Sequence, residues 1–454
     1  MMNKKFISCW LLILTIPWTM AVGGPNDHKT NILPYSIEQK KLDNGLNVVT
    51  VPYDSPGLAA FYIVVRVGSR DEVEPGKSGF AHFFEHMMFR GTDKYPKERY
   101  QETLKSTGAS ANANTSLDRT VYHMTGSAEK LETMFEIESD RFRRLKYSVQ
   151  GFKTEAGAVK GEYTKNFASP YMQLYEATNN TAFEEHTYKH TTMGFFDDVV
   201  DMPNQYEYSI EFFNRFYRPE YCTIIVVGDV KHNQVVELST KYFGGWKPGS
   251  FKSKIPVESE QTETRYTHVE KASFPPYIDL NFKAPAFSND NNDFHALSAL
   301  SEILFSEKSA LYKKLVLEEQ KVRSIGGGIY PTRDPYLWSA SASLVKPEDM
   351  KYVYDQILAT VEASKSEMVS AEDLKQTLER MKYSFAMRMD SPDAIANSLA
   401  QFTWLTGDPQ SLNEAYRIYD SVTPEDLLRV AKKYLTVDKM TVATISPDKE
   451  SGLK

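Results

Sequence analysis

The chain contains very little cysteine. Only Cys9 and Cys222 occur among its 454 residues, and Cys9 falls inside an N-terminal apolar run that we expect to be removed. A single remaining thiol excludes an intramolecular disulfide. Because Cys222 stands in an apolar stretch, we expect it to be a small core residue rather than a reactive thiol.

The sequence also lacks an excess of positive charge. Its 53 Lys and Arg residues are outnumbered by 60 Asp and Glu residues, which gives a formal net charge of −7. No basic run with interleaved aromatic residues occurs, so we expect no nucleic acid among the partners. A hydrophobic content of 41% and a charged content of 25% are typical of a folded protein, and this length predicts two or more domains.

The longest apolar run, near the N-terminus, is short for a membrane span. Lys4 and Lys5 precede it, it covers about residues 6–20, and residues 19–21 offer small side chains at the positions that determine cleavage. We predict a signal peptide at residues 1–21, which makes the protein periplasmic or secreted in a bacterium, with no integral membrane span after cleavage. The alternative is that the run is retained as an N-terminal anchor.

The most informative stretch is His-x-x-Glu-His at residues 82–86. Its apolar surroundings and its lack of Gly or Pro are typical of a short buried helix. At about 100° per residue, His82 and His86 lie on one face of such a helix, with Glu85 beside them. Two neutral imidazoles can hold one zinc ion, and the carboxylate can take a proton from a zinc-bound water. The alternative is a packing helix whose histidines are merely one turn apart.

This pattern resembles the metal helix of the M16 (pitrilysin-like, inverzincin) metallopeptidases. Residues 42–46 resemble the opening hairpin of that family, residues 79–82 the entry to its metal helix, and residues 89–92 the exit. The resemblance, closest to bacterial M16B-like members, implies an α+β fold. Two similar halves, each an antiparallel-rich sheet with helices packed on it, would be related by internal duplication and form a clamshell. It further implies a zinc metalloendopeptidase.

The resemblance also supplies the rest of the expected site. In this family a glutamate on a separate helix completes the ligand set, and Glu162 stands at the matching position; Glu155 matches an acidic residue that supports the metal from behind its ligands. One Zn²⁺ per chain is therefore expected, held by His82, His86 and Glu162, with Glu85 as general base and then general acid. The alternative for the later pair is a solvated helix face, because lysines surround it.

Residues 110–116 carry small side chains, which let another backbone approach closely, as an edge strand requires when it pairs with an extended peptide. In the family the matching strand pairs with the substrate, so the resemblance assigns Asn112 and Ala113 to substrate binding. The alternative is an ordinary turn-rich connection. The expected substrates are peptides or unfolded protein segments.

The chain divides at residues 247–264, which are rich in Lys, Ser, Glu and Pro and are predicted to form a linker. We expect the zinc-binding domain at residues 32–246 and a similar domain without a metal site at residues 265–450. Residues 217–227 are echoed in pattern by residues 434–444, which agrees with duplication. The second half contains no His-x-x-Glu-His.

Hydrophobic spacing predicts the remaining elements. Expected strands are 37–42, 46–51, 59–67, 120–124, 223–227, 266–270, 278–282, 322–330 and 337–344. Expected helices are 80–90, 96–106, 128–145, 151–167, 208–215, 233–242, 293–305, 310–319, 347–364 and 371–389.

The second half departs from the family in one respect. Many M16 members carry there an Arg and a Tyr that hold substrate carbonyls, whereas alignment places Val316 and Arg323 at those positions. The chain thus resembles the zinc-bearing partner of two-subunit M16 proteases, and a homo- or heterodimer with a second M16-like subunit that supplies Arg and Tyr is expected. The alternative is peptide binding by the Asn112 strand alone. A non-catalytic peptide-binding or assembly subunit is the alternative function, and the complete set of base and ligands argues against it.

Overall fold

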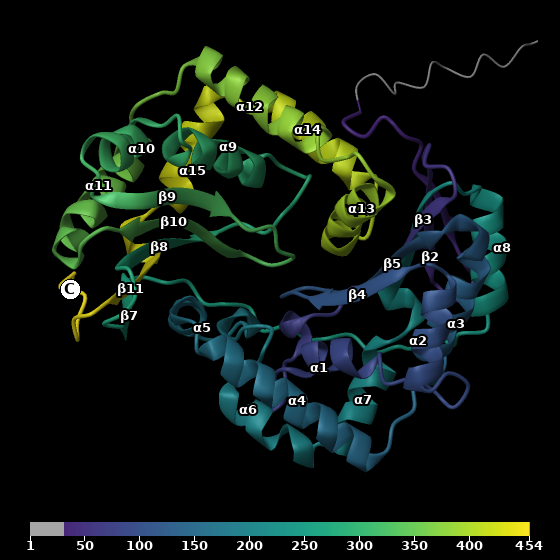
Figure 1. Cartoon of the computed structure of the whole chain (residues 1–454). Helices are drawn as coiled ribbons and strands as arrows, with labels where there is room; N and C mark the ends of the chain where they lie inside the picture. The colour runs from purple at the N-terminus through teal and green to yellow at the C-terminus, as the bar shows by residue number, and fades with distance from the viewer. Residues whose placement is uncertain (1–30, 454) are drawn as a thin grey trace, which may run out of the picture.

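The computed structural model describes residues 31–453, so the predicted signal peptide lies outside the described residues. Within them, no helix combines the length and the apolar character that crossing a bilayer requires. Two β-sheets, each with its own layer of helices, make up the molecule (Figure 1).

The first sheet has six strands in the order β1-β2-β6-β3-β5-β4. β2 and β6 run parallel, and the other neighbours are antiparallel. β4 therefore lies at one edge. The strands are β1 (Glu38–Lys41), β2 (Asn47–Pro52), β3 (Leu58–Val65), β4 (Ser110–Thr115), β5 (Thr120–Ser127) and β6 (Cys222–Gly228).

The second sheet repeats this plan with five strands in the order β7-β11-β8-β10-β9. β7 and β11 are again the parallel pair, and β9 takes the edge position that β4 has in the first sheet. This shared order confirms the predicted duplication of an antiparallel-rich α+β half. The strands are β7 (Arg265–Glu270), β8 (Tyr277–Ala284), β9 (Val322–Ile329), β10 (Tyr336–Leu344) and β11 (Met440–Ser446).

In the described part of the chain the first half has eight helices, most of which cover one face of the first sheet and enclose the larger hydrophobic core. Side chains of β3 alternate between this core, which receives Phe61 and Ile63, and the opposite face, which receives Tyr62 and Val64. The helices are α1 (Phe80–Met87), α2 (Lys97–Ser106), α3 (Leu131–Arg144), α4 (Val149–Phe167), α5 (Pro170–Ala182), α6 (Phe196–Asp201), α7 (Tyr206–Phe216) and α8 (His232–Phe243).

Within residues 31–453 the second half has seven helices, most of which build an equivalent core on the second sheet. They are α9 (Asp293–Phe305), α10 (Ala310–Tyr312), α11 (Met350–Ala363), α12 (Ala371–Ala386), α13 (Pro392–Thr406), α14 (Ser411–Ser421) and α15 (Pro424–Tyr434). The predicted linker at 247–264 falls in the stretch between α8 and β7, which contains no helix or strand.

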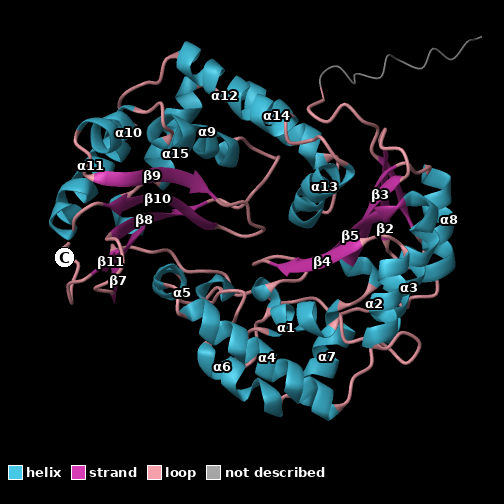
Figure 2. Ribbon diagram, in the orientation of Figure 1, coloured by secondary structure: helices cyan, strands magenta, loops and turns pink. Residues whose placement is uncertain are grey.

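The two halves exchange helices across their interface (Figure 2). α13 of the second half packs its Leu399 and Ile395 on the free face of the first sheet, against Tyr62 and Val64. α5 of the first half packs Leu174 on β7 and β11. β3 is apolar along nearly its whole length and so needs cover on both faces. α5, α13 and α14 are not among the predicted elements.

Most predicted elements are confirmed within a few residues of their ends. The helix that carries the motif ends at Met87 rather than at residue 90. Beyond Met87 the backbone hydrogen bonds span three residues instead of four, from the N–H groups of Phe89 and Arg90 to the carbonyls of His86 and Met87. Cys222 is buried at the start of β6, as predicted.

Candidate metal centre

α1 has an apolar face and a polar face. Phe80, Phe83 and Phe84 are buried in the first core, whereas Glu85 and His86 on the other face are only half-buried. His82 lies one turn before His86, and the two imidazole ring centroids are 4.8 Å apart. Burial of the aromatic face therefore fixes the rotation of the helix about its axis, and with it the direction of the polar side chains.

A buried carboxylate fixes the start of α1. Glu72 accepts hydrogen bonds from the backbone N–H of Gly79 at 2.7 Å and of Ala81 at 2.6 Å. Gly79 itself has φ +92°, which favours glycine. Burial raises the pKa of Glu72 to about 8, although the two N–H groups oppose this. Sequence reasoning missed Glu72, because a loop residue outside the helix carries no pattern of its own.

α4 brings the two later glutamates to the metal helix. The Ser148 side chain accepts a hydrogen bond from the N–H of Gly151 and begins the helix. Val159 and neighbouring apolar residues turn into the core. Glu155 and Glu162, two turns apart, thereby face α1.

The three expected ligand side chains converge. Nε2 of His86 lies 3.1 Å from Oε2 of Glu162, and Nε2 of His82 lies 3.8 Å from Oε1 of the same carboxylate. One ligand atom from each residue lies within 4.8 Å of the others. Among residues 31–453, this is the one group of three or more such side chains that could hold a metal ion.

Glu155 holds His86 from behind. Its Oε1 lies 3.1 Å from Nδ1 of His86, and its Oε2 pairs with Arg90. When the proton of the imidazole is on Nδ1, Nε2 keeps a free lone pair, and this nitrogen is the one that lies beside Glu162. Burial raises the pKa of Glu155, but the hydrogen bonds from His86 and Arg90 outweigh it and lower the pKa overall, so this carboxylate is charged at neutral pH.

Glu85 is held by the edge strand. The hydroxyl of Thr115, the last residue of β4, donates to Oε2 of Glu85 at 2.6 Å. Burial raises the pKa of Glu85, although the hydrogen bond from Thr115 opposes this, so its carboxylate is a stronger base than an exposed one. Thr115 was not assigned a role from the sequence, although it ends the predicted strand of small residues.

The donor set fits a zinc ion. Ligand atoms about 2.1 Å from a tetrahedral zinc lie about 3.4 Å apart, which is close to the separations found here. Burial lowers the pKa of His82 to about 4, so that its imidazole is neutral as a ligand must be. Two imidazoles and one carboxylate leave a fourth position for water, as hydrolytic zinc sites do.

The residues assigned to substrate binding lie on β4. Asn112 is exposed and Ala113 is buried against the core, as expected on an edge strand with alternating faces. Val316 packs against the second core, and Arg323 is exposed on β9. Position 316, where the family pattern has Arg, is thus Val, and position 323, where it has Tyr, is Arg.

His186 and His190, the other pair of histidines close together in the chain, flank the short turn Thr187–Lys189. Both are buried, and Nε2 of His186 lies 2.9 Å from Asp334 of the second half. These contacts give the two histidines a role in packing.

Two family models match the chain. The model described as insulinase (peptidase family M16) matches residues 48–194, and the model described as peptidase M16 inactive domain matches residues 205–381. The chain belongs to the M16 peptidase family. The M16 inactive-domain match covers much of the half that has no His-x-x-Glu-His.

Relatives of this M16 chain include bacterial and mitochondrial proteins. A zinc protease PqqE of Helicobacter pylori is 29% identical over 93% of this chain and 96% of its own length. A probable mitochondrial-processing peptidase subunit beta of Schizosaccharomyces pombe is 22% identical over 92% of each chain. The crystal structure of a protease from Helicobacter pylori superposes with a TM-score of 0.83, at 28% identity, over 91% of this chain and all of that one.

Proposed function

We propose that this M16 chain is a zinc metalloendopeptidase whose zinc is held by His82, His86 and Glu162. The convergence of two imidazoles and a carboxylate from separate helices is the observation that carries the proposal. The zinc proteases among its relatives support the same class of reaction.

Each side chain around the ligands has a task in hydrolysis. A bound zinc ion supplies Lewis acidity, which acidifies a water and polarises a carbonyl. Oε1 of Glu85 accepts the proton of the attacking water and then delivers it to the leaving amine. Thr115 holds the other oxygen of Glu85 in place, and Glu155 keeps Nε2 of His86 free of a proton.

We further propose that the substrate is a peptide or an unfolded segment that pairs with β4, with Asn112 and Ala113 aligning it. β4 is the edge of its sheet and its last residue touches Glu85, so a paired peptide would run past the general base. Position 316 is Val where the family pattern has Arg, and position 323 is Arg where it has Tyr, which supports a second M16-like subunit that supplies the missing pair. Full peptidase activity of the purified single chain would defeat the proposal of a partner.

We also propose that the chain is exported. The basic pair and apolar run of residues 1–21 support this, together with the likeness in fold to the periplasmic protease PqqL from Escherichia coli. Fractionation of cells that express the full chain, with N-terminal sequencing of the product, tests export directly.

Substitution of the general base tests the proposed chemistry. We expect Glu85→Gln to bind one zinc per chain and to lose hydrolysis of a fluorogenic peptide by on the order of 10²–10⁴-fold. His86→Ala should lose both zinc and hydrolysis, and a chelator should abolish wild-type activity. Glu102→Gln, an exposed glutamate on α2, is the control. Cleavage by Glu85→Gln at the wild-type rate would show that the role of Glu85 is wrong.

A further inference from the structure

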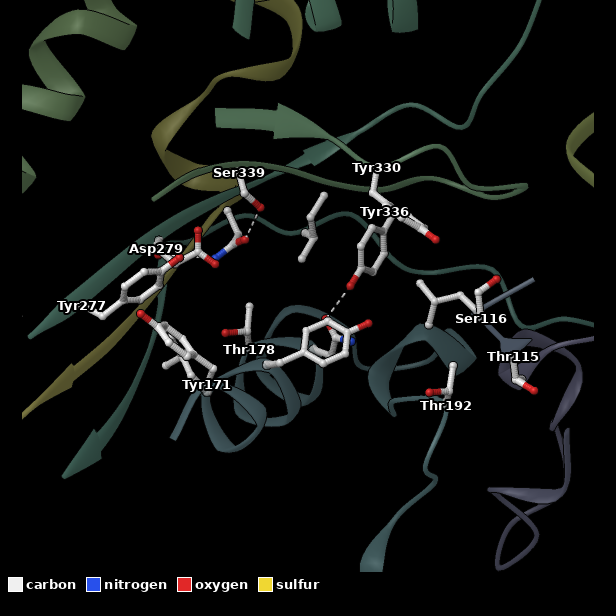
Figure 3. A pocket seen from close by; sticks show the side chains of 16 residues that line it. Thr115, Ser116, Tyr171, Thr178, Thr192, Tyr277, Asp279, Tyr330, Tyr336 and Ser339 are labelled. Carbon is white, nitrogen blue, oxygen red and sulfur yellow. Dashed lines mark hydrogen bonds between the residues drawn. The ribbon is translucent and has the colours of Figure 1, made fainter. Parts of the chain in front are cut away.

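A cavity of about 550 Å³ lies between the two halves, beside the proposed metal centre. Thr115 and Ser116 stand at one end of it, and Tyr277 and Asp279 stand at the other (Figure 3). α5 borders it on one side, and β8 and β10 border it on the other. Because Thr115 also holds Glu85, the cavity begins where β4 ends at the general base.

The walls of the cavity are rich in tyrosine. Tyr171, Tyr175 and Tyr330 line it and are 45%, 37% and 46% exposed, which is high for large aromatic side chains in a concave site. Tyr171 stands edge-on to Tyr277, with ring centroids 5.1 Å apart. Aromatic faces that are open to a cavity attract cationic groups through the ring quadrupole.

Asp279 is the one charged residue among the sixteen that line the cavity, all of them in the described part of the chain. It lies on β8, where Ile278 and Leu280 turn into the core and Asp279 turns toward the cavity. Its Oδ1 is buried and has no hydrogen-bond partner within residues 31–453. Nor does any Lys, Arg or His of that range form an ion pair with it.

Two other carboxylates at the interface between the halves have partners. Asp118 accepts hydrogen bonds from the hydroxyl of Tyr188 and the N–H of Arg333, and Asp334 pairs with Arg70. A buried carboxylate without a counter-charge costs stability unless a partner arrives. Consistent with this, burial raises the pKa of Asp279 to about 7, against the opposing effect of the nearby Asn281 side chain. The chain therefore keeps an acid that no cation of its own neutralises.

We propose that this cavity is a specificity subsite for a cationic side chain of the peptide, with Asp279 as counter-charge and the tyrosines as walls. The inference rests on the proposed peptidase function and names a substrate class for it. A peptide paired along β4 passes Thr115 and enters the cavity. Arginine suits the site best, because its planar guanidinium stacks on aromatic rings and binds a carboxylate with two hydrogen bonds.

Peptides that differ in one charge test the subsite. One arginine is moved through an otherwise neutral fluorogenic sequence, and each peptide is compared with its citrulline counterpart, which has the same shape without the charge. At one position, wild-type kcat/KM should favour arginine by about tenfold or more. Asp279→Asn should remove that preference, so that each arginine peptide and its citrulline counterpart are cleaved with equal kcat/KM. Asp290→Asn, an exposed aspartate outside the cavity, should keep the preference.

Binding separates this inference from the proposed function. The arginine peptide should bind Glu85→Gln more tightly than the citrulline peptide in fluorescence anisotropy, and addition of Asp279→Asn should abolish the difference. If the wild-type protein hydrolyses no peptide while Glu85→Gln keeps this binding preference, the proposed peptidase function is wrong and the subsite stands. Equal rates for both peptides at every position would overturn the subsite.

Two further comparisons isolate the pairing of a peptide side chain with Asp279. Acetylated and free-amine peptides are compared, and a preference that follows the free amino terminus would overturn the assignment to a side chain. Asp279→Ser serves as a second variant, with circular dichroism as the check on folding. It must lose the arginine preference as Asp279→Asn does, and retention of the preference in both folded variants would overturn the role of Asp279.

Discussion

Three glutamates at the proposed metal centre have different neighbours, which supports a different proposed role for each. Glu162 is 37% exposed and faces both imidazoles. Glu155 is buried between His86 and Arg90, whereas Glu85 rests on a neutral hydroxyl of β4. A carboxylate among cations stays charged, and one against a neutral donor in a buried place is better able to exchange a proton. Residue type alone does not distinguish a ligand, a support and a base.

Glu155→Gln tests the support role. The amide still accepts a hydrogen bond from Nδ1 of His86 but carries no charge, so it makes the imidazole a weaker ligand and leaves Arg90 without its partner. We expect zinc affinity to fall by about 10–100-fold, measured by competition with a chromophoric chelator. Glu237→Gln, exposed on α8, should leave it unchanged. Wild-type affinity in Glu155→Gln would rule out the support role.

Among the elements, α5 and α13 have the largest effect on how the halves are joined. Each belongs to one half by sequence and covers the sheet of the other. The free face of β3 is apolar, so the first sheet would expose Tyr62 and Val64 without α13. Burial of this face couples the folding of the two halves, because neither sheet has both faces covered without the other half's helix.

Leu399→Ala on α13 tests that coupling. The side chain is fully buried, so the substitution should cost about 2–5 kcal/mol of unfolding free energy. Since the helix spans the interface, unfolding in urea should remain one transition at a lower midpoint when far-UV circular dichroism and tryptophan fluorescence are compared. Leu317→Ala, 59% exposed, is the matched control. Two separate transitions in the variant would indicate that the halves fold independently.

Across the whole molecule, a polar junction joins the halves near the cavity. Nε of Arg70 lies 2.5 Å from Oδ2 of Asp334, and Nε2 of His186 lies 2.9 Å from the same atom. Beside this ion pair, the backbone N–H of Arg333 donates to Asp118. These bonds cross between segments far apart in sequence, so they fix the relative position of the two sheets on either side of the proposed site.

Asp334→Asn tests the junction through its pH dependence. Burial alone would raise the pKa of Asp334, but hydrogen bonds from His186 and Arg70 lower it well below its usual range. A carboxylate with a lowered folded-state pKa stabilises the fold above its unfolded pKa and loses that contribution as the pH falls. We expect the variant to lose about 1–2 kcal/mol at pH 7, a value reduced for partial solvent exposure.

The difference between Asp334→Asn and the wild type should narrow as the pH falls below about 4. Urea midpoints at a series of pH values measure it, and Asp438→Asn, an exposed aspartate, is the control. A loss of stability that does not change with pH would mean that the ion pair is not its cause.

The sequence by itself determined the local parts of this protein. Helical spacing was enough to put His82, Glu85 and His86 on one face, because neighbours along a helix fix one another's direction. The hairpin, most strands and the repeated plan of the two halves were also readable, since hydrophobic alternation and turn residues act over short distances. Glu162 came from a family resemblance, because no local rule connects residues on separate helices.

Only the tertiary structure decided which residues that are far apart in the sequence come into contact. The capping of α1 by Glu72, the contact of Thr115 with Glu85 and the exchange of α5 and α13 each join segments whose sequences carry no sign of their partner. In the sequence Asp279 is an ordinary polar residue in a strand, and only the packing of α5 opposite β8 places it in a cavity. Such features depend on packing between distant segments, and packing is a property of the whole fold rather than of any stretch within it.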